Sequence, residues 1–165
     1  MDSKVITFAN FKGGTGKTTN STMTGIELAR RGYKTLLIDL DPQANATNLY
    51  LKTKNNVGGE ITSFDETLMT AIKNKNLNPA IINVIPNLDV LPSSADFSLY
   101  PRYMENLISD YTERVKYLST LINPWKANYD YLLVDVPPTI SLITDTALYM
   151  TDYAIVVLQT QERSL

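Results

Sequence analysis

The chain has 165 residues, of which 44% are hydrophobic and 19% charged, a composition typical of a globular domain and not of a disordered segment. It contains no cysteine and no histidine, which excludes disulfides, cysteine-ligated clusters, most zinc sites and histidine-based acid–base catalysis. The net charge of -2 gives no sign of a strongly basic nucleic-acid binder. No apolar run reaches the roughly 18–20 residues of a membrane span, so we expect a soluble, intracellular protein.

The first part of the chain has the pattern of a βαβ unit. Residues 5–9 are β-branched and aromatic, a glycine cluster follows at 13–16, and residues 17–31 carry apolar side chains at helical spacing. The apolar run at 35–38 lacks polar alternation, which is typical of a parallel strand covered on both faces. We therefore predict a strand, a loop, a helix and a second strand, joined by a right-handed crossover.

The remaining segments continue to mix helices and strands. Residues 45–51 fit either a short helix or a loop. Helical spacing recurs at 64–74, 104–122 and 140–150. Further strands are predicted at 81–85, 88–91, 131–134 and 154–158. This order predicts an α/β protein with a mainly parallel sheet and helices on both faces. We expect residues 1–165 to form one domain that lacks its C-terminal part, because only seven residues follow the last predicted strand.

The loop between the first strand and the first helix has the features of a phosphate-binding loop. Residues 11–19 read Phe-Lys-Gly-Gly-Thr-Gly-Lys-Thr-Thr. Glycines let consecutive backbone N–H groups surround phosphate oxygens, and the helix N-terminus adds the positive end of its dipole. In such a loop Lys17 would reach the β- and γ-phosphates and the Thr18 hydroxyl would ligate Mg²⁺. The usual pattern has glycine where this chain has Phe11, so the strict match fails.

The same residues resemble the deviant Walker A ATPases, a family of P-loop NTPases marked by a lysine just before Gly-Gly-x-Gly-Lys-[Ser/Thr]. Lys12 stands at that position. The resemblance implies that Lys12 crosses the interface of an ATP-sandwiched dimer and touches the partner's phosphates, where its charge would aid catalysis. The predicted nucleotide-binding residues are Lys12, Gly13, Gly14, Thr15, Gly16, Lys17, Thr18 and Thr19.

Acidic side chains end two of the predicted buried strands. Asp39 and Asp41 follow the second strand, and Asp135 follows four apolar residues, which is the Walker B pattern. Ligands of open α/β sheets bind beyond the carboxyl ends of the strands, so we expect these acids near the phosphate loop. The predicted metal site is Thr18, Asp39 and Asp135, with Asp135 holding Mg²⁺ directly or through water.

The run from Leu37 to Thr47, which contains Asp-Leu-Asp-Pro-Gln, resembles the corresponding segment of ParA/Soj-type partition ATPases. Residues 91–94, 129–135 and 156–161 fit the same family in the same order. The resemblance implies that Asp41 orients the attacking water and that Asp39 lies near the Mg²⁺ shell. With Lys12 and Lys17, Asp41 completes the predicted catalytic residues. The family more often has a small polar residue at Val136, a departure that we expect to be tolerated.

As the resemblance implies, the protein would be an ATPase that acts as a switch in plasmid or chromosome segregation. ATP would drive a homodimer that binds DNA without sequence preference, and a centromere-binding adaptor of the ParB type would stimulate its weak hydrolysis. The expected cofactors are ATP and Mg²⁺, the expected location is the bacterial cytoplasm on the nucleoid, and no membrane partner is expected.

Two alternatives remain open from the sequence. One is a MinD-like ATPase that positions cellular machinery, and the other is a nucleotide-binding fragment without productive turnover. An iron–sulfur electron carrier that shares the loop would need cysteines, and the chain has none. Adenine as the base rests on the resemblance alone.

Overall fold

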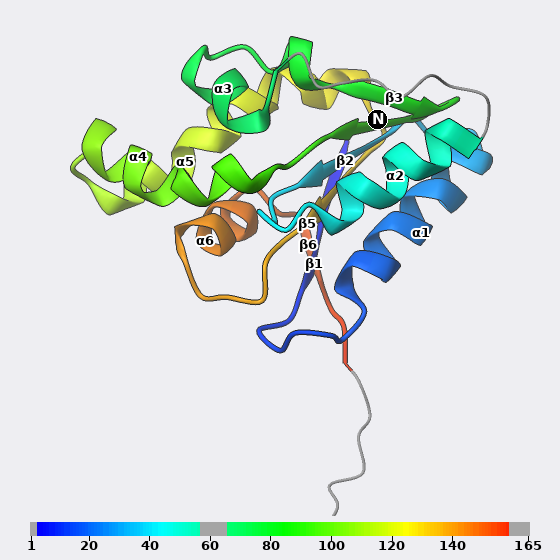
Figure 1. Ribbon diagram of the computed structural model, residues 1–165, viewed down its shortest axis with the longest axis horizontal. Helices are drawn as coiled ribbons and strands as arrows, with labels where there is room; N and C mark the ends of the chain where they lie inside the picture. Colours follow the sequence, from blue (N-terminus) through cyan, green and yellow to red (C-terminus); the bar gives the residue numbers. More distant parts are fainter. Residues whose placement is uncertain (1–2, 57–65, 159–165) are drawn as a thin grey trace, which may run out of the picture.

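The computed structural model describes residues 3–56 and 66–158, and within these ranges six strands form one sheet in the order β3-β4-β2-β5-β1-β6 (Figure 1). The strands are β1 (Lys4–Ala9), β2 (Thr35–Asp39), β3 (Ile82–Ile85), β4 (Leu88–Leu91), β5 (Tyr131–Asp135) and β6 (Tyr153–Val156). All neighbouring strands are parallel except β3 and β4, which form an antiparallel hairpin. The predicted α/β fold with a mainly parallel sheet is confirmed.

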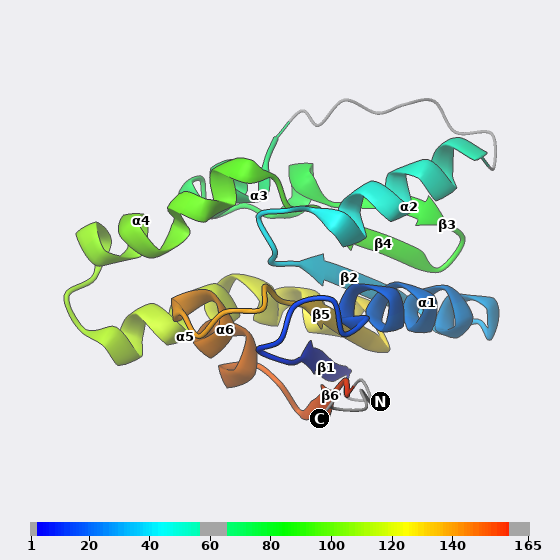
Figure 2. The ribbon, with the colours of Figure 1, turned by 60° about the horizontal axis from the view of Figure 1, so that its bottom comes forward.

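Helices cover both faces of this sheet. They are α1 (Lys17–Arg30), α2 (Asn45–Asn56), α3 (Leu68–Lys73), α4 (Tyr100–Leu107), α5 (Tyr111–Ile122) and α6 (Leu142–Tyr149), with short 3₁₀ turns η1 (Asn78–Ala80), η2 (Ala95–Leu99) and η3 (Asn123–Asn128). Helices α1 and α2 pack on one face, and α3 to α6 pack on the other (Figures 1 and 2). The two faces therefore have separate hydrophobic cores.

The central strand β2 shows why the sequence lacked polar alternation there. All five of its residues are buried. Leu36 and Ile38 belong to the core beneath α3 to α6, whereas Leu37 belongs to the core beneath α1 and α2. Since successive side chains of a strand point to opposite faces, a strand covered on both sides carries consecutive apolar residues, as β2 does at residues 36–38.

The single helix predicted over 104–122 is wrong, because the structure breaks it into α4 and α5. Ile108 has an extended backbone, with φ -134° and ψ 124°. The Asp110 carboxylate then accepts a hydrogen bond from the Glu113 N–H at 2.9 Å and caps α5. The Arg114 side chain donates to the carbonyls of Ile108 and Ser109 at 2.6 and 2.9 Å. The Asp-x-x-Glu pattern of a capping box was the signal that helical periodicity concealed.

Three other boundaries differ from the expectation or extend it. The segment at 45–51 is helical and continues as α2 to Asn56. The helix predicted from residue 64 is α3, which starts at Leu68, and residues 64 and 65 lie outside the described ranges. The strand predicted at 154–158 is β6, which runs from Tyr153 to Val156. All its residues are exposed, because it lies at the sheet edge beside β1. In the described part of the chain, no helix is long and apolar enough to cross a bilayer.

Candidate nucleotide-binding site

A pocket of about 490 Å³ opens where the carboxyl ends of β1, β2 and β5 meet the start of α1. It is lined by the phosphate loop, by the segment after β2 and by the loop after β5. The lining residues are Gly13, Gly14, Thr15, Gly16, Lys17, Thr18, Thr19, Asp41, Gln43, Asn45 and Pro138. The structure thus brings Asp41 to the predicted loop. Gln43, Asn45 and Pro138 were not predicted as site residues, although Gln43 and Asn45 lie in the run that resembles the ParA/Soj family.

The loop backbone adopts the conformation that its glycines permit. Gly14 and Gly16 have φ of 73° and 89°, in the left-handed region that other residues rarely adopt. Gly16 is also the N-cap of α1, so the first N–H groups of the helix face the pocket end of the loop. This arrangement provides backbone donors and a helix dipole for an anion.

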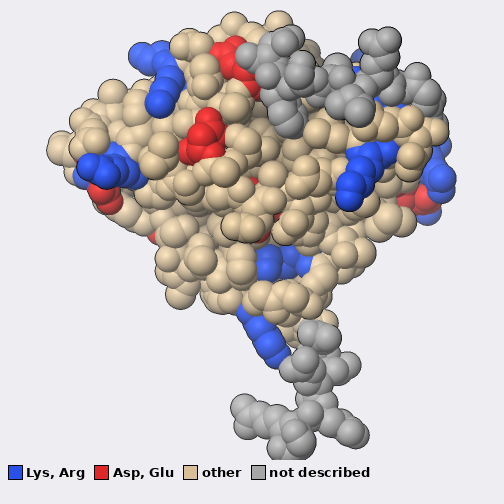
Figure 3. All heavy atoms as spheres, in the orientation of Figure 1, with Lys and Arg blue, Asp and Glu red and all other residues tan. Residues whose placement is uncertain are grey.

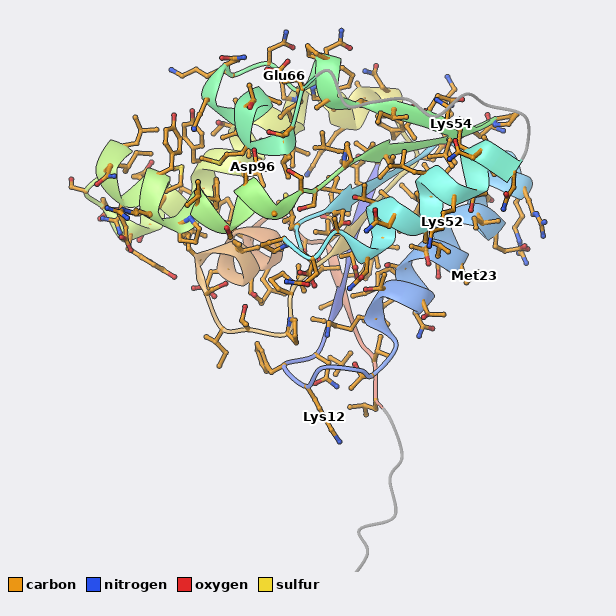
Figure 4. All side chains as sticks on the ribbon, in the orientation of Figure 1. Lys12, Met23, Lys52, Lys54, Glu66 and Asp96 are labelled. Carbon is orange, nitrogen blue, oxygen red and sulfur yellow. The ribbon has the colours of Figure 1, made fainter. Side chains whose placement is uncertain are left out.

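The two lysines of the loop occupy different environments. Lys17 is buried, and its Nζ donates to the main-chain carbonyl of Lys12 at 3.4 Å. That carbonyl also accepts from the Thr15 hydroxyl. The Lys12 side chain instead points away from the body of the protein (Figure 4). Lys12 therefore supports the loop through its backbone carbonyl, while its side chain extends outward.

Thr18, which lines the pocket, is hydrogen-bonded to Asp135, which does not line it and is fully buried at the end of β5. The Thr18 hydroxyl donates to Asp135 Oδ2 at 2.7 Å, and the Ser21 hydroxyl donates to Oδ1 at 3.2 Å. The pKa of Asp135 is raised to about 7, mainly by burial and also by the nearby charges of Asp39 and Asp41, although the hydrogen bonds from Thr18 and Ser21 lower it. A buried carboxylate with a raised pKa gains from a cation. Ser21 was missed, although its position one turn after Thr18 places it on the same helix face.

The residues fit a magnesium ion held together with phosphates. Among the described residues no group of three or more acidic side chains forms a cage of its own. Mg²⁺ usually keeps several waters and uses one or two protein ligands together with substrate phosphates. Thr18 and Asp135, whose oxygens are hydrogen-bonded to each other, could supply that smaller set.

Asp39 organises the segment that carries Asp41. It is fully buried beside Asp135 on the neighbouring strand. Its carboxylate accepts from the N–H of Asp41 at 3.0 Å and from the N–H and hydroxyl of Thr47 at 2.9 and 2.7 Å. Burial raises the pKa of Asp39 to about 6, against the hydrogen bonds from Thr47. Both carboxylate oxygens of Asp39 thus accept hydrogen bonds from the turn that follows β2 and from the start of α2. A position of Asp39 near the Mg²⁺ shell remains a prediction.

Asp41 lies at the wall of the pocket and is almost completely buried. Its Oδ1 accepts from the Gln43 N–H at 2.9 Å, and its carbonyl accepts from the Ala44 N–H at 2.8 Å. Ala44 has a positive φ of 53°, which turns the chain into α2. This tight turn after Pro42 holds the carboxylate of Asp41 toward the phosphate loop.

Comparison with known proteins agrees with this geometry. A family model described as AAA domain, AAA_31, matches residues 3–165. The chain belongs to this AAA domain family. The sporulation initiation inhibitor protein Soj of Bacillus subtilis is 34% identical over 165 residues, which cover 98% of this chain and 60% of Soj. In sequence, this AAA domain is similar to proteins of the ParA and Soj type.

Two solved structures resemble the AAA domain closely. A plasmid partition protein from Borrelia burgdorferi superposes with a TM-score of 0.79 at 28% identity, covering 98% of this chain and 68% of that one. A variant of McdA from Cyanothece in complex with ATP gives a TM-score of 0.79 at 25% identity, covering 94% and 56%. The chain thus spans about three-fifths of the length of Soj and just over half of McdA.

Proposed function

We propose that this protein binds ATP with Mg²⁺ and hydrolyses it as the switch of a DNA partition system. The observation that carries the proposal is the Thr18–Asp135 hydrogen bond, which joins the Walker B strand β5 to the phosphate loop, where Thr18 lines one pocket together with Asp41. The ATP complex of McdA and the plasmid partition protein of Borrelia burgdorferi support the choice of nucleotide and process.

Each side chain has a task in this proposal. The loop amides and Lys17 bind the β- and γ-phosphates, and Thr18 and Asp135 hold Mg²⁺, which offsets phosphate charge when bound. Asp41 orients a water so that its oxygen bonds to the γ-phosphorus while the bond from that phosphorus to the bridging oxygen breaks. Phosphate transfer needs positioning and charge more than proton transfer, so a chain without histidine can perform it.

The outward ammonium group of Lys12 supports self-association of the ATP-bound form. In that form Lys12 of one copy would approach the phosphates held by the other. A ParB-type adaptor would stimulate the weak hydrolysis, and the dimer would bind DNA without sequence preference on the nucleoid in the cytoplasm. On the face drawn in Figure 3, basic side chains are scattered over the surface.

The test is the solution mass of the Asp41→Ala variant, measured by light scattering with Mg²⁺ and either ATP or ADP. We expect a dimer with ATP and a monomer with ADP, and phosphate release by the unchanged protein but not by the variant. Binding of a random-sequence duplex to the ATP form then separates DNA partition from a MinD-like positioning role. A monomer in every condition would contradict the switch, and ATP binding without any phosphate release would favour a nucleotide-binding fragment.

A further inference from the structure

Helices α1 and α2 approach each other through a tyrosine and a glycine. Tyr50 of α2 is fully buried, and its hydroxyl donates to the main-chain carbonyl of Thr22 in α1 at 2.8 Å. Gly25 of α1 faces the same hydroxyl, and a Cβ at this position would lie 2.2 Å from the tyrosine oxygen. The Tyr50 hydroxyl can therefore approach α1 this closely only because Gly25 has no side chain.

On the side of α1, this contact continues to the phosphate site. The Thr22 hydroxyl donates to the Thr18 carbonyl at 2.7 Å, one turn earlier in the helix. Thr18 in turn donates its own hydroxyl to Asp135. The tyrosine is thus bonded to the helix whose first turn would hold the phosphates and Mg²⁺.

On the side of α2, the same tyrosine is linked to the segment of Asp41. Tyr50 lies one helical turn after Thr47, whose N–H and hydroxyl both donate to Asp39. Asp39 accepts the N–H of Asp41, and Asp41 lines the pocket. A shift of α2 along α1 would therefore move Asp41 relative to the phosphate loop.

We propose that the Tyr50 hydroxyl, seated over Gly25, is a positioning group that sets the separation between the P-loop helix and the Asp41 segment. Tyr50 lines no part of the pocket and acts through Asp41. This role rests on the proposed ATP hydrolysis, but the placement of the segment can be measured without it. The hydroxyl is the specific requirement, since the phenyl ring alone would keep the packing of the core.

The first test compares Tyr50→Phe with Tyr129→Phe. Tyr129 is a matched control, because its hydroxyl donates to Asp89 Oδ2 at 2.8 Å and it lies just before β5, at the end opposite to Asp135. Tyr50→Phe should lower kcat by about threefold to tenfold, the range for loss of one buried hydrogen bond, with KM for ATP changed by less than about twofold. Amide hydrogen exchange over residues 41–47 should rise in Tyr50→Phe and stay unchanged in Tyr129→Phe.

The second test uses the close contact at Gly25. Gly25→Ala alone places its Cβ against the tyrosine oxygen and should raise exchange over residues 41–47 at least as much as Tyr50→Phe does. In the double variant the nearest atoms to that Cβ are methyl groups of Leu88 and Leu133 at 3.4 and 3.5 Å, which is ordinary contact. We expect the double variant to match Tyr50→Phe rather than to add the two effects.

Four results would overturn the positioning role. They are equal exchange over residues 41–47 in the two tyrosine variants, a uniform rise in exchange over the whole protein, a rise in KM without a fall in kcat, and additive effects in the double variant. If the unchanged protein binds ATP without hydrolysing it, the proposed function fails. The exchange data and the double variant then decide the positioning role by themselves.

Discussion

The hydroxyl of Thr18 donates a 2.7 Å hydrogen bond to the carboxylate of Asp135, although 117 positions separate the two residues in the chain. The contact exists because β5 lies beside β1 in the sheet, so that Asp135 pairs with Phe8 just before the phosphate loop begins. It brings a buried carboxylate under the loop that would hold phosphates. The electrostatic cost of that burial leads to the first prediction.

Stability without nucleotide and Mg²⁺ should fall as the pH rises from about 4 to about 7. Burial raises the pKa of Asp135 to about 7 and of Asp39 to about 6, so the folded protein binds protons more tightly than the unfolded chain does. Protonation therefore favours the fold below these values, and this stabilisation is lost as each carboxyl ionises. Thermal unfolding midpoints across this pH range measure the effect.

Asp135→Asn is the control for that prediction. It removes the carboxyl with the higher pKa, so the midpoint should vary less with pH than it does in the unchanged protein. Mg²⁺ with nucleotide should also reduce the loss at high pH, because a cation favours the charged carboxylate. An unfolding midpoint that rises with pH in the unchanged protein would contradict the burial argument.

Lys17→Ala and Lys12→Ala should give different defects. Lys17 is buried at the pocket, and removal of its charged hydrogen bonds to phosphate should weaken nucleotide binding by about 10- to 100-fold or more. Lys12→Ala keeps the backbone carbonyl that supports the loop, so it should bind nucleotide as a monomer and fail to dimerise. Equilibrium binding of a fluorescent ATP analogue and light scattering measure the two properties. Identical behaviour of the two variants would refute separate roles.

Asp110→Ala should destabilise the protein by about 1 kcal/mol, the usual effect of removing an N-cap side chain. The Asp110 carboxylate accepts the Glu113 N–H at 2.9 Å, and alanine would leave this donor without its partner. Chemical denaturation measures the change. Asp110→Ser, which retains a capping oxygen, should recover most of the loss, and a variant as stable as the unchanged protein would show that the cap does not determine the break between α4 and α5.

Val156→Lys should reduce any association at high protein concentration through the β6 edge, which is separate from the proposed ATP-dependent dimer. Val156 is 61% exposed on β6, the edge strand whose other residues are also exposed and uncharged. Such an edge is a template for pairing with another chain, and a lysine opposes this. Light scattering against concentration measures the effect. Leu107→Lys is the matched control, because Leu107 is 48% exposed at the end of α4 and should leave association unchanged.

The sequence alone determined the fold class and the residues of the phosphate loop. Glycines before Lys17, helical spacing after it, and apolar runs without alternation are local signals, and each follows from backbone geometry or from burial on two faces. The break at Asp110 was equally local, but a strong hydrophobic period hid it. Local patterns thus predicted which helices and strands form, but they predicted less well where these elements begin and end.

Only the tertiary structure showed which contacts each acidic residue makes. It also showed that Ser21 and Tyr50, which no motif indicated, are hydrogen-bonded to residues of the site or its helix. Asp39 proved to bind the turn of Asp41 and the start of α2, a role that depends on how the chain folds back after Pro42. Ser21 reaches Asp135, and Tyr50 reaches Thr22, only because strands and helices distant in sequence pack together. The spacing of Ser21 from Thr18 indicates a shared helix face, but only the three-dimensional packing decides that this face meets Asp135.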